Sequence, residues 1–365
     1  MLGRAEGKSD RGEEPLMRNA GRLMPYMNRR TVMLAGAATA LLPQLAFGQT
    51  AGGVVPSPDP EVPDAPAVQI SNGLATAILY LPDTERGYYR GTRFDWSGLV
   101  AALEVNGHSY FGRWFADYDP KKHDAVAGPA QDWVTGQGYE AAPVGGTFVK
   151  IGVGVLRKPA ELARGFPTLE IVDPGRWSTE VRADAVDFIH EVSDPASGYG
   201  YRHIKTVSLP AGRPEMVLTQ RIVSTGLNPI DTQMYNHNFF VLDGQPSGPD
   251  VEVSFSFVLE PFNMRGDAVE VTGNMIKYVK PVEGSVRMQL RGFGPSASDY
   301  AMRVENKRTG ACVLVTSDTP LSDLVFWSSP RTTCPEAYIH VRAERDQPMS
   351  WETKYHFYSL PPAAA

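Results

Sequence analysis

Apolar and polar residues alternate in short segments along most of the chain, from Val68 to the C-terminal region. Gly, Pro, Asn and Asp separate these segments, a pattern typical of strands that bury one face. A short helix or turn is predicted at 158–164, and no longer stretch has the apolar spacing and caps of a helix. Because strands do not alternate with helices, we expect a mainly β fold of large antiparallel sheets. The alternation predicts strands at residues 75–80, 99–105, 147–156, 185–192, 215–223, 233–242, 251–259, 312–316 and 337–343.

Residues 1–48 form an N-terminal extension whose second part, 27–48, has the pattern of an export signal. This part begins with Arg29 and Arg30, continues with an apolar run rich in Ala and Leu, and ends in small residues before a cleavage point after Gly48. The sequence Thr-Val-Met-Leu after the two arginines is similar to a twin-arginine signal, and an ordinary secretory signal is the alternative. We therefore predict a periplasmic or secreted protein.

A membrane anchor fits this extension less well than an export signal does. Pro43 interrupts the apolar run, which is shorter than the roughly 20 residues that span a bilayer. The polar residues 1–26 precede the signal, so Met27 is a candidate for the true start. After the signal, residues 49–66 are rich in Gly and Pro and predict a flexible linker. Residues 67–361 are then expected to form a single domain.

The charge of the chain excludes some partners. Its 365 residues include 41 acidic and 35 basic side chains, a net charge of −6 at pH 7. Residues 1–48 hold seven basic and four acidic side chains, so their removal leaves a net charge of −9. A nucleic-acid binder needs a basic face to neutralise phosphates. We therefore expect no nucleic-acid partner, and no membrane partner after removal of the signal.

The motifs of several common enzyme classes are absent. No nucleophile-elbow pattern surrounds a serine, Gly152-Val-Gly154 lacks the third glycine of a dinucleotide site, and His190 has no second histidine at the metalloprotease spacing. Two cysteines are too few for a disulfide scaffold or a four-thiolate zinc site. Cys312 and Cys334 both fall on predicted strands, and in an oxidising compartment they either pair or stay free.

The predicted strand 233–242 has polar residues on both of its faces. Alternation places Tyr235 and His237 on one face and Asn236 and Asn238 on the other, so neither face is cleanly apolar. This pattern is unusual for a strand that only covers a core. Histidine transfers protons near neutral pH, which makes His237 a catalytic candidate. The alternative is a core histidine whose hydrogen bonds are satisfied by a neighbour.

The segment 334–342 alternates cleanly. Its apolar residues point one way and its polar residues point the other, namely Glu336, Tyr338, His340 and Arg342. Glu336 follows a proline at the start of this strand. A carboxylate partly withdrawn from water there has a raised pKa and is suited to act as a general base. The alternative is a solvated strand face.

Three segments, in this order, resemble the galactose mutarotases, the aldose 1-epimerase family. Residues 235–243 read Tyr-Asn-His-Asn-Phe-Phe-Val-Leu-Asp and resemble the family's Asn-His signature. Residues 334–336, Cys-Pro-Glu, resemble the strand that bears the catalytic glutamate, and residues 346–357 resemble the family's last strand. The resemblance implies a β-supersandwich with a sugar cleft on a concave sheet face. It also implies that His237 is the catalytic acid and Glu336 the base.

The resemblance further implies an arginine that binds the substrate, which Arg90 or Arg93 would supply. Asp95, close to these arginines in the sequence, is a further candidate for substrate binding. So are Asn236 and Asp243 in the segment 235–243. Two histidines, one in a predicted turn and one in a lysine-rich loop, are expected to be structural or solvated: His108 and His123.

Anomer exchange needs one base and one acid on opposite sides of the anomeric carbon, and no metal or organic cofactor. We therefore predict a cofactor-free isomerase acting on a small sugar or oligosaccharide. One alternative is a non-catalytic carbohydrate-binding protein that uses the same cleft. Another is a polysaccharide lyase or hydrolase on a related fold. A hydrolase needs a second acidic residue about 5–10 Å from the first, for which the candidates are Asp95, Asp231 and Asp243. Four aromatic residues either stack on a sugar or pack beneath loops: Trp114, Phe115, Tyr118 and Trp133.

Overall fold

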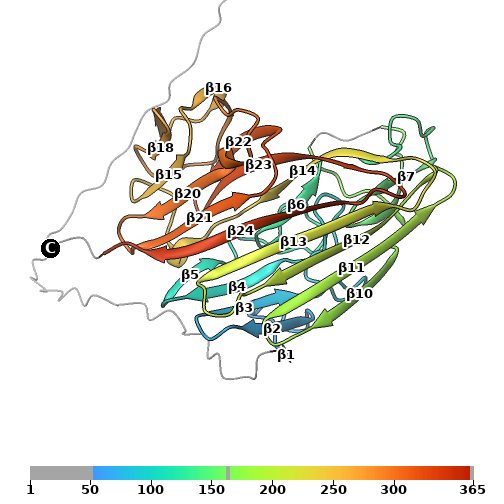
Figure 1. Ribbon diagram of the computed structural model, residues 1–365, viewed down its shortest axis with the longest axis horizontal. Helices are drawn as coiled ribbons and strands as arrows, with labels where there is room; N and C mark the ends of the chain where they lie inside the picture. The colour runs from blue at the N-terminus through green and yellow to red at the C-terminus, as the bar shows by residue number, and fades with distance from the viewer. Residues whose placement is uncertain (1–51, 162–164, 362–365) are drawn as a thin grey trace, which may run out of the picture. The chain divides into compact units, whose positions relative to one another are not determined.

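The fold is built from antiparallel strands (Figure 1). The computed structural model describes residues 52–161 and 165–361. The export signal predicted within residues 1–48 and the alternative start at Met27 therefore lie outside the described residues. The described residues form sheets of ten, six, five and three strands. The prediction of a mainly β fold with large antiparallel sheets is confirmed.

The largest sheet has ten strands, and each strand pairs antiparallel with its neighbours. Strands β12, β13 and β24 are long neighbouring arrows in Figure 1. The order across the sheet is β10 (Arg176–Val181), β11 (Ala185–Asp194), β12 (Tyr199–Ser208), β13 (Glu215–Ser224), β24 (Met349–Ser359), β21 (Ala311–Ser317), β20 (Ala301–Asn306), β15 (Val251–Phe255), β18 (Met275–Tyr278) and β17 (Val269–Thr272).

The other sheets complete the fold. The six-stranded sheet has the order β16 (Glu260–Arg265), β19 (Val286–Arg291), β22 (Asp323–Ser329), β23 (Thr332–Ala343), β14 (Ile230–His237) and β6 (Ala130–Trp133). The five-stranded sheet runs in chain order through β1 (Gly53–Val55), β2 (Ala67–Ser71), β3 (Ala75–Tyr80), β4 (Val100–Val105) and β5 (His108–Phe111). The three-stranded sheet contains β7 (Thr147–Lys150), β8 (Gly154–Arg157) and β9 (Ile171–Asp173).

Helical structure in the described residues consists of two three-residue 3-10 turns, η1 (Leu242–Gly244) and η2 (Ala297–Asp299). The short helix or turn predicted at 158–164 has no helix in its described part, residues 158–161, and the remainder lies outside the described residues. No described helix has the length and apolar character needed to cross a membrane.

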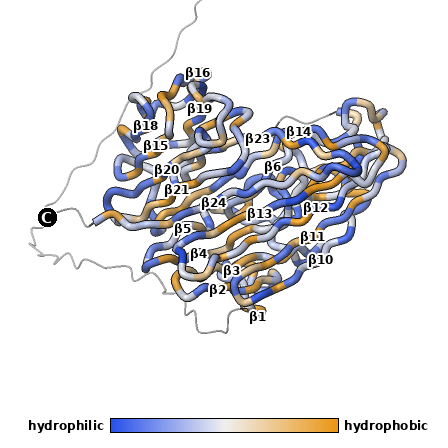
Figure 2. Tube along the Cα trace, in the orientation of Figure 1, coloured by the Kyte–Doolittle hydropathy of each residue, from blue (hydrophilic) through white to orange (hydrophobic). Residues whose placement is uncertain are grey.

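The alternation along the long strands buries one row of side chains. On β24, Trp351, Thr353, Tyr355 and Phe357 all face inward and are at most 2% exposed. Figure 2 shows hydrophilic and hydrophobic residues intermixed along β11, β12 and β13. Inward-facing residues of the ten-, six- and five-stranded sheets join in one apolar cluster. Each fully buried large apolar side chain stabilises the fold by about 1.5–3 kcal/mol, so this cluster is the main stabilising element of the sheets.

The segment predicted as one strand at 147–156 is instead a hairpin of β7 and β8. Gly152 lies in the turn with a φ of +78°, a conformation that favours glycine. Its carbonyl accepts a hydrogen bond from the Trp96 amide (3.1 Å), and its own amide donates to the Tyr201 hydroxyl (2.9 Å). A Cβ at this position would lie 2.4 Å from Cγ of Asp95. The turn therefore requires glycine both for its φ and for the close approach of Asp95.

Two other predicted strands are shorter in the structure. The strand predicted at 233–242 is β14, which begins earlier and ends at His237. Phe239 has a φ of +44°, so the chain leaves the extended conformation there before η1 begins. The strand predicted at 251–259 is β15, which ends at Phe255. In both cases the alternation continues in the sequence beyond the last residue of the strand, and after β14 Phe240 still forms an isolated bridge with Thr333.

The described part of the predicted flexible linker, residues 52–66, packs against the domain. Its strand β1 pairs with β2 at the edge of the five-stranded sheet. Asp59 is 6% exposed, and its carboxylate accepts hydrogen bonds from the Tyr88 hydroxyl (3.0 Å) and from Nη1 of Arg113 (3.2 Å). A buried carboxylate bonded in this way holds the segment in place, which the high Gly and Pro content did not predict.

The two cysteines lie in different sheets. Cys312 is on β21 of the ten-stranded sheet and Cys334 is on β23 of the six-stranded sheet. Both are buried and free. Of the two arrangements that the sequence left open, the structure has the unpaired one.

We predict that Gly152→Ala destabilises the protein much more than Gly107→Ala does. Both glycines have a φ close to +79°, but a Cβ on Gly107 meets nothing within 4 Å. The backbone cost alone is about 1 kcal/mol, and the clash with Asp95 raises the total for Gly152→Ala to about 3 kcal/mol or more. Urea unfolding of the two variants measures the difference. Equal destabilisation would contradict the close packing of the turn on Asp95.

Candidate functional site

A cavity of about 490 Å³ lies where β6, β7, β14 and β23 meet the loops around residues 92–93, 134–140 and 165–169. We call it the Arg93 cavity. One group of its lining residues is polar: Arg93, Asp132, Lys150, Tyr235 and Tyr338. Another group is aromatic or aliphatic: Tyr139, Phe148, Leu156, Phe166 and Leu169. A concave site with a few convergent polar groups among apolar ones is typical of small-molecule binding.

The polar side of the cavity is organised around the Asp132 carboxylate. Its Oδ1 accepts from Nζ of Lys150 (3.0 Å), and its Oδ2 accepts from Nε of Arg93 and from the Tyr235 hydroxyl (both 3.1 Å). Nη2 of Arg93 also donates to the Tyr235 hydroxyl (3.0 Å). Asp132 on β6 is the direct register partner of Tyr235 on β14, so the strand pairing itself brings these groups together.

Two cations keep this buried carboxylate ionised. Burial alone raises the pKa of Asp132, but the charges of Lys150 and Arg93 outweigh it and hold the pKa below its usual range. Burial likewise lowers the pKa of Arg93, but Tyr235 and Asp132 more than offset it, so the pKa of Arg93 is raised. The guanidinium also lies over the rings of Phe94 (4.4 Å) and Phe166 (3.8 Å). Asp132 and Arg93 are therefore both charged at neutral pH.

The structure brings the two predicted catalytic residues into direct contact. Nε2 of His237, at the end of β14, lies 3.2 Å from Oε1 of Glu336 on the neighbouring strand β23. The two side chains are 5% and 7% exposed. Aromatic rings surround the imidazole, with Phe239 stacked on it at 3.8 Å and Phe94 and Trp327 in edge contact. These residues form an acid–base pair in an apolar environment.

Burial determines where the proton of this pair resides. Desolvation raises the pKa of Glu336 to about 8, although Arg93 and Arg287 lower it in part. Desolvation, assisted by Arg93, lowers the pKa of His237 well below its usual value. At neutral pH the pair is therefore uncharged, with a proton on the Glu336 carboxyl and a neutral imidazole beside it.

The pair lies next to the Arg93 cavity without lining it. Tyr235 and Tyr338 line the cavity and also contact the pair, Tyr235 with its ring 6.0 Å from that of His237. The Tyr338 hydroxyl donates to Oε2 of Glu336 (3.4 Å), and its ring stacks on that of Tyr235 (4.2 Å between centroids). Tyr338 is thus a polar contact between the cavity and the buried carboxyl.

The two asparagines that flank His237 explain why neither face of this segment is apolar. Oδ1 of Asn236 accepts from Nε2 of Gln131 on the neighbouring strand (2.9 Å). Asn238 donates to the carbonyl of Pro335 (2.8 Å) and accepts from the Tyr355 hydroxyl (2.8 Å). Both are buried and neither lines the cavity. These hydrogen bonds hold the end of β14 against its neighbours and so position His237.

Asp95, predicted to bind substrate, lies in a separate buried network. Its side chain is fully buried and accepts from Nζ of Lys205 (2.9 Å) and from the amide and hydroxyl of Ser97 (2.8 and 2.7 Å). Burial raises its pKa, but Lys205 and His203 outweigh this effect and lower the pKa to about 2. Asp95 does not line the Arg93 cavity, and its hydrogen-bonding capacity is used within the protein.

The remaining predicted residues lie apart from the cavity lining. The Arg90 amide donates a hydrogen bond to the carbonyl of Pro120 (2.7 Å). Asp243 holds the start of β5, where its carboxylate contacts Nδ1 of His108 (2.9 Å) and accepts from the Ser109 amide (2.8 Å). His108 is thus structural, as expected. Of the five predicted substrate-binding residues, Arg93 lines the cavity; its role as a ligand contact stays a prediction.

The loop aromatics pack against other residues instead of facing the cavity. Trp114 stacks on Phe239 (4.8 Å between centroids), and Trp133 is buried in edge contact with Trp351 (6.0 Å). Phe115 and Tyr118 belong to the same loop cluster as Trp114. Of the two interpretations that the sequence left open, stacking on a sugar or packing within the protein, these contacts show the second.

Most of the residues that line the cavity were not identified from the sequence as site residues, among them Asp132, Lys150 and Phe166. Lys150 carried a signal, because a lysine at a position of the predicted strand 147–156 surrounded by apolar residues calls for a buried partner. Asp132 lies on β6, a strand of four residues that was not predicted at all. Its partners are 18 and 103 residues away in sequence, so nothing local pointed to them.

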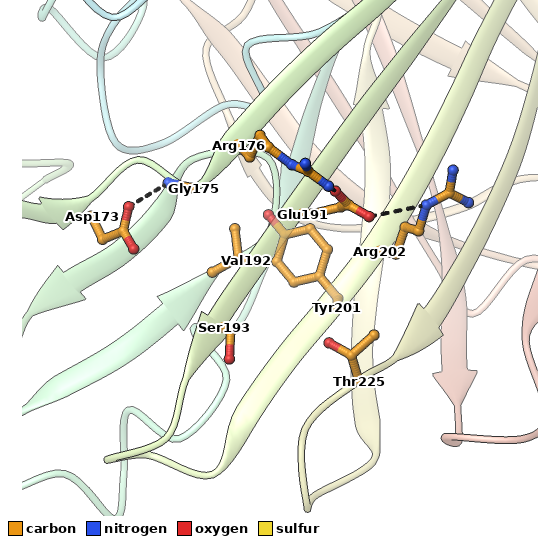
Figure 3. Close-up of a pocket in the computed structure, with 9 residues that line it drawn as sticks. All are labelled: Asp173, Gly175, Arg176, Glu191, Val192, Ser193, Tyr201, Arg202 and Thr225. Carbon is orange, nitrogen blue, oxygen red and sulfur yellow. Dashed lines mark hydrogen bonds and ion pairs between the residues drawn. The ribbon is translucent and has the colours of Figure 1, made fainter.

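A second cavity, of about 530 Å³, lies on strands β10 to β12 (Figure 3). Its charged residues pair with one another. Glu191 accepts from Arg176 and forms an ion pair with Arg202 at 3.2 Å (Figure 3). Arg176 is 79% exposed, so water screens these charges. Among the described residues, no group of three or more His, Cys, Asp or Glu side chains is placed to hold a metal ion.

Comparisons with known proteins identify the fold. No protein-family model matches the sequence, and no curated protein matches it. The Slr1438 protein from Synechocystis sp. PCC 6803 has a similar structure, with a TM-score of 0.50 and 14% identity over 84% of this chain and 99% of that chain. The GalM/aldose epimerase homologue from C. elegans has a TM-score of 0.50 and 13% sequence identity, over 81% of this chain and 100% of that chain. A galactose mutarotase-like protein from Clostridium acetobutylicum has a TM-score of 0.50 and 12% sequence identity, over 81% of this chain and 96% of that chain. The described chain therefore has a galactose mutarotase-like fold, which confirms the resemblance seen in the sequence at the level of the fold.

We predict that Glu336→Gln becomes progressively more stable than the wild type as the pH rises from 5 to 9. The native carboxyl, with a pKa of about 8, binds its proton more tightly than the unfolded chain does. The wild type therefore loses unfolding free energy as the pH rises from 4.5 to 8, whereas the amide has no proton to lose. Urea unfolding at several pH values measures this, with the exposed Glu283→Gln as control. A difference independent of pH would show that Glu336 is not held protonated.

Proposed function

We propose that the Arg93 cavity binds a sugar and that the Glu336–His237 pair interconverts its anomers, which is the aldose 1-epimerase reaction. The observation that carries the proposal is the position of the pair. A buried carboxyl and a buried imidazole lie 3.2 Å apart, next to a cavity rich in hydrogen-bonding groups. A general acid and a general base are the groups that this reaction requires, and the chemistry needs no cofactor.

The lining of the cavity suits a sugar. A sugar ring has hydroxyl groups around its edge and C–H groups on its faces. Arg93 and Lys150 can donate to hydroxyl oxygens, and Asp132 can accept from a hydroxyl group. Phe166 and Tyr139 offer aromatic surface to the C–H faces. The same cavity thus supplies both kinds of contact.

The reaction moves two protons in opposite directions. Ring opening removes a proton from the C1 hydroxyl and adds one to the ring oxygen, and closure after rotation of the aldehyde reverses both transfers. With the proton on Glu336, the pair is ready for Glu336 to donate and for His237 to accept. The reverse step restores the starting protonation. Each residue thus acts once as acid and once as base in a full cycle, and in ring opening their roles are the reverse of those that the resemblance implied.

Catalysis requires the sugar to reach the pair. Nε2 of His237 and Oε1 of Glu336 face each other, so the anomeric centre fits between them when the two side chains move apart. Tyr338, which lines the cavity and donates to Glu336, is the polar contact along which the substrate would approach.

The direct contact of the pair favours a second candidate, a non-catalytic carbohydrate-binding protein. In that case Glu336 and His237 only satisfy each other beneath the cavity. A hydrolase is less well supported, because its candidate second acids are engaged elsewhere. Asp231 contacts His340 and Arg342, and neither Asp95 nor Asp243 lines the cavity. The export signal remains a prediction, and with it we propose that the sugar is met in the periplasm or outside the cell.

We predict that Glu336→Gln lowers the rate of mutarotation by roughly 10²–10⁴-fold, because one of the two proton-transfer groups is lost. Polarimetry on freshly dissolved sugars measures the rate, and calorimetry on the same samples should show that sugar binding persists. Glu283→Gln, an exposed change of the same kind, should leave both unchanged. Full mutarotation by Glu336→Gln would refute the catalytic assignment. Sugar binding without mutarotation in any of the three proteins would establish the binding-only candidate.

We predict that kcat/KM of the wild type falls as the pH rises above about 8 and stays level down to below pH 6.5. The pair needs one shared proton, and it loses this proton as Glu336 ionises at a pKa of about 8. Because the pKa of His237 is lowered, the pair gains a second proton only at a pH well below the usual pKa of histidine. The charged or titratable groups that interact with Glu336 include Arg93, Asp132, Arg287, Tyr235, Tyr338 and Cys334. A rate that rises through pH 8 would contradict this assignment of the proton.

A further inference from the structure

The polar side of the Arg93 cavity carries one more positive than negative charge. Arg93 and Lys150 both line it, with side chains 12% and 10% exposed. They share a single counterion, the Asp132 carboxylate. Glu140 also lines the cavity but is exposed, so water screens its charge. This buried group therefore has a net charge of +1, in a chain whose overall net charge is −6.

The nearby ionisable groups do not offset this charge at neutral pH. Glu336 keeps its proton because burial raises its pKa to about 8. Burial also raises the pKa values of Tyr235 and Tyr338, so both hydroxyls are neutral. Neither Glu336 nor the two tyrosines therefore supplies a negative charge that would neutralise the excess positive charge.

Both cations have donors left for a ligand. Within the described residues, Arg93 uses Nε and Nη2 in its bonds to Asp132 and Tyr235, and a guanidinium has five N–H groups. Lys150 donates to Asp132 and to the carbonyl of Trp133, and an ammonium has three N–H groups. A buried charge without a partner is costly to desolvate. An anionic ligand group in the cavity would remove this cost and accept charge-assisted hydrogen bonds.

We propose that the sugar bound in the Arg93 cavity carries one carboxylate, as a uronic acid does. This inference rests on the proposed function, since it concerns the same sugar site. A single carboxylate matches the single excess positive charge held by Arg93, Lys150 and Asp132. A phosphate ester carries about −1.5 to −2 charges and would leave the site with excess negative charge.

Calorimetry with two matched pairs of sugars tests the inference: glucuronate against glucose, and galacturonate against galactose. Within each pair the sugars differ at C6, where a carboxylate replaces a hydroxymethyl group. We expect the uronate to bind about tenfold more tightly in the pair that the site accepts, because a charge-assisted hydrogen bond replaces a neutral one. This preference should weaken as NaCl is added. Glucose 6-phosphate should bind less tightly than glucuronate.

Two variants should move the preference in opposite directions. Lys150→Met removes the excess positive charge and should abolish the preference for the uronate. Asp132→Asn removes the counterion and should increase the preference, and it tests the inference even if Lys150→Met does not fold. Lys277→Met removes a lysine on β18 that forms an ion pair with Glu252, and it should leave the preference unchanged. Thermal unfolding of each variant identifies those that fold.

The outcomes separate this inference from the proposed function. Neutral sugars that bind as tightly as their uronates would overturn the inference and leave sugar binding intact. Tighter binding of glucose 6-phosphate than of glucuronate would overturn the matching of a single charge. Absence of binding by all four sugars would overturn the proposed function and the inference with it. A preference for the uronate that responds to Lys150→Met and Asp132→Asn in the stated directions would establish the inference.

Discussion

The candidate site depends on the burial of one carboxylate between two cations. Asp132 holds Lys150 and Arg93 through its two oxygens, and the pairing of β6 with β14 sets it beside Tyr235. Arg93, fixed in this way, lowers the pKa values of both Glu336 and His237, against burial in the first case and with it in the second. The charge arrangement in the cavity is thus a consequence of this ion-pair network, whereas the protonation of the pair behind it is set mainly by burial and modified by Arg93.

Much of the fold follows from local pattern. Alternation predicted most of the long strands, since one buried face per strand leaves a clear period of two in the sequence. It failed where apolar residues continue past the end of the pairing, as after His237, and where a glycine turn divides an alternating run, as at Gly152. Backbone partners and positive φ values decide those boundaries, and neither is a property of a single residue type.

The site was only partly predictable. His237 and Glu336 stood out as polar residues on strands and through their resemblance to known motifs, and the structure brings them together. Asp95 and Asp243 looked equally suitable in the sequence, but Lys205 and His108 engage them elsewhere. Asp132 could not be found, because its role comes from contacts with residues far along the chain. Residue type indicates which groups can do chemistry, whereas strand register decides which of them face a common cavity.

The central claim is that the cavity and the buried pair act on one ligand. A crystal structure of the protein with a bound sugar tests it most directly. We predict a sugar in the Arg93 cavity whose anomeric oxygen and ring oxygen lie within hydrogen-bonding distance of Glu336 and His237, with these two side chains more than 3.2 Å apart. A sugar bound elsewhere, or bound in the cavity with its anomeric carbon turned away from an unchanged pair, would contradict it.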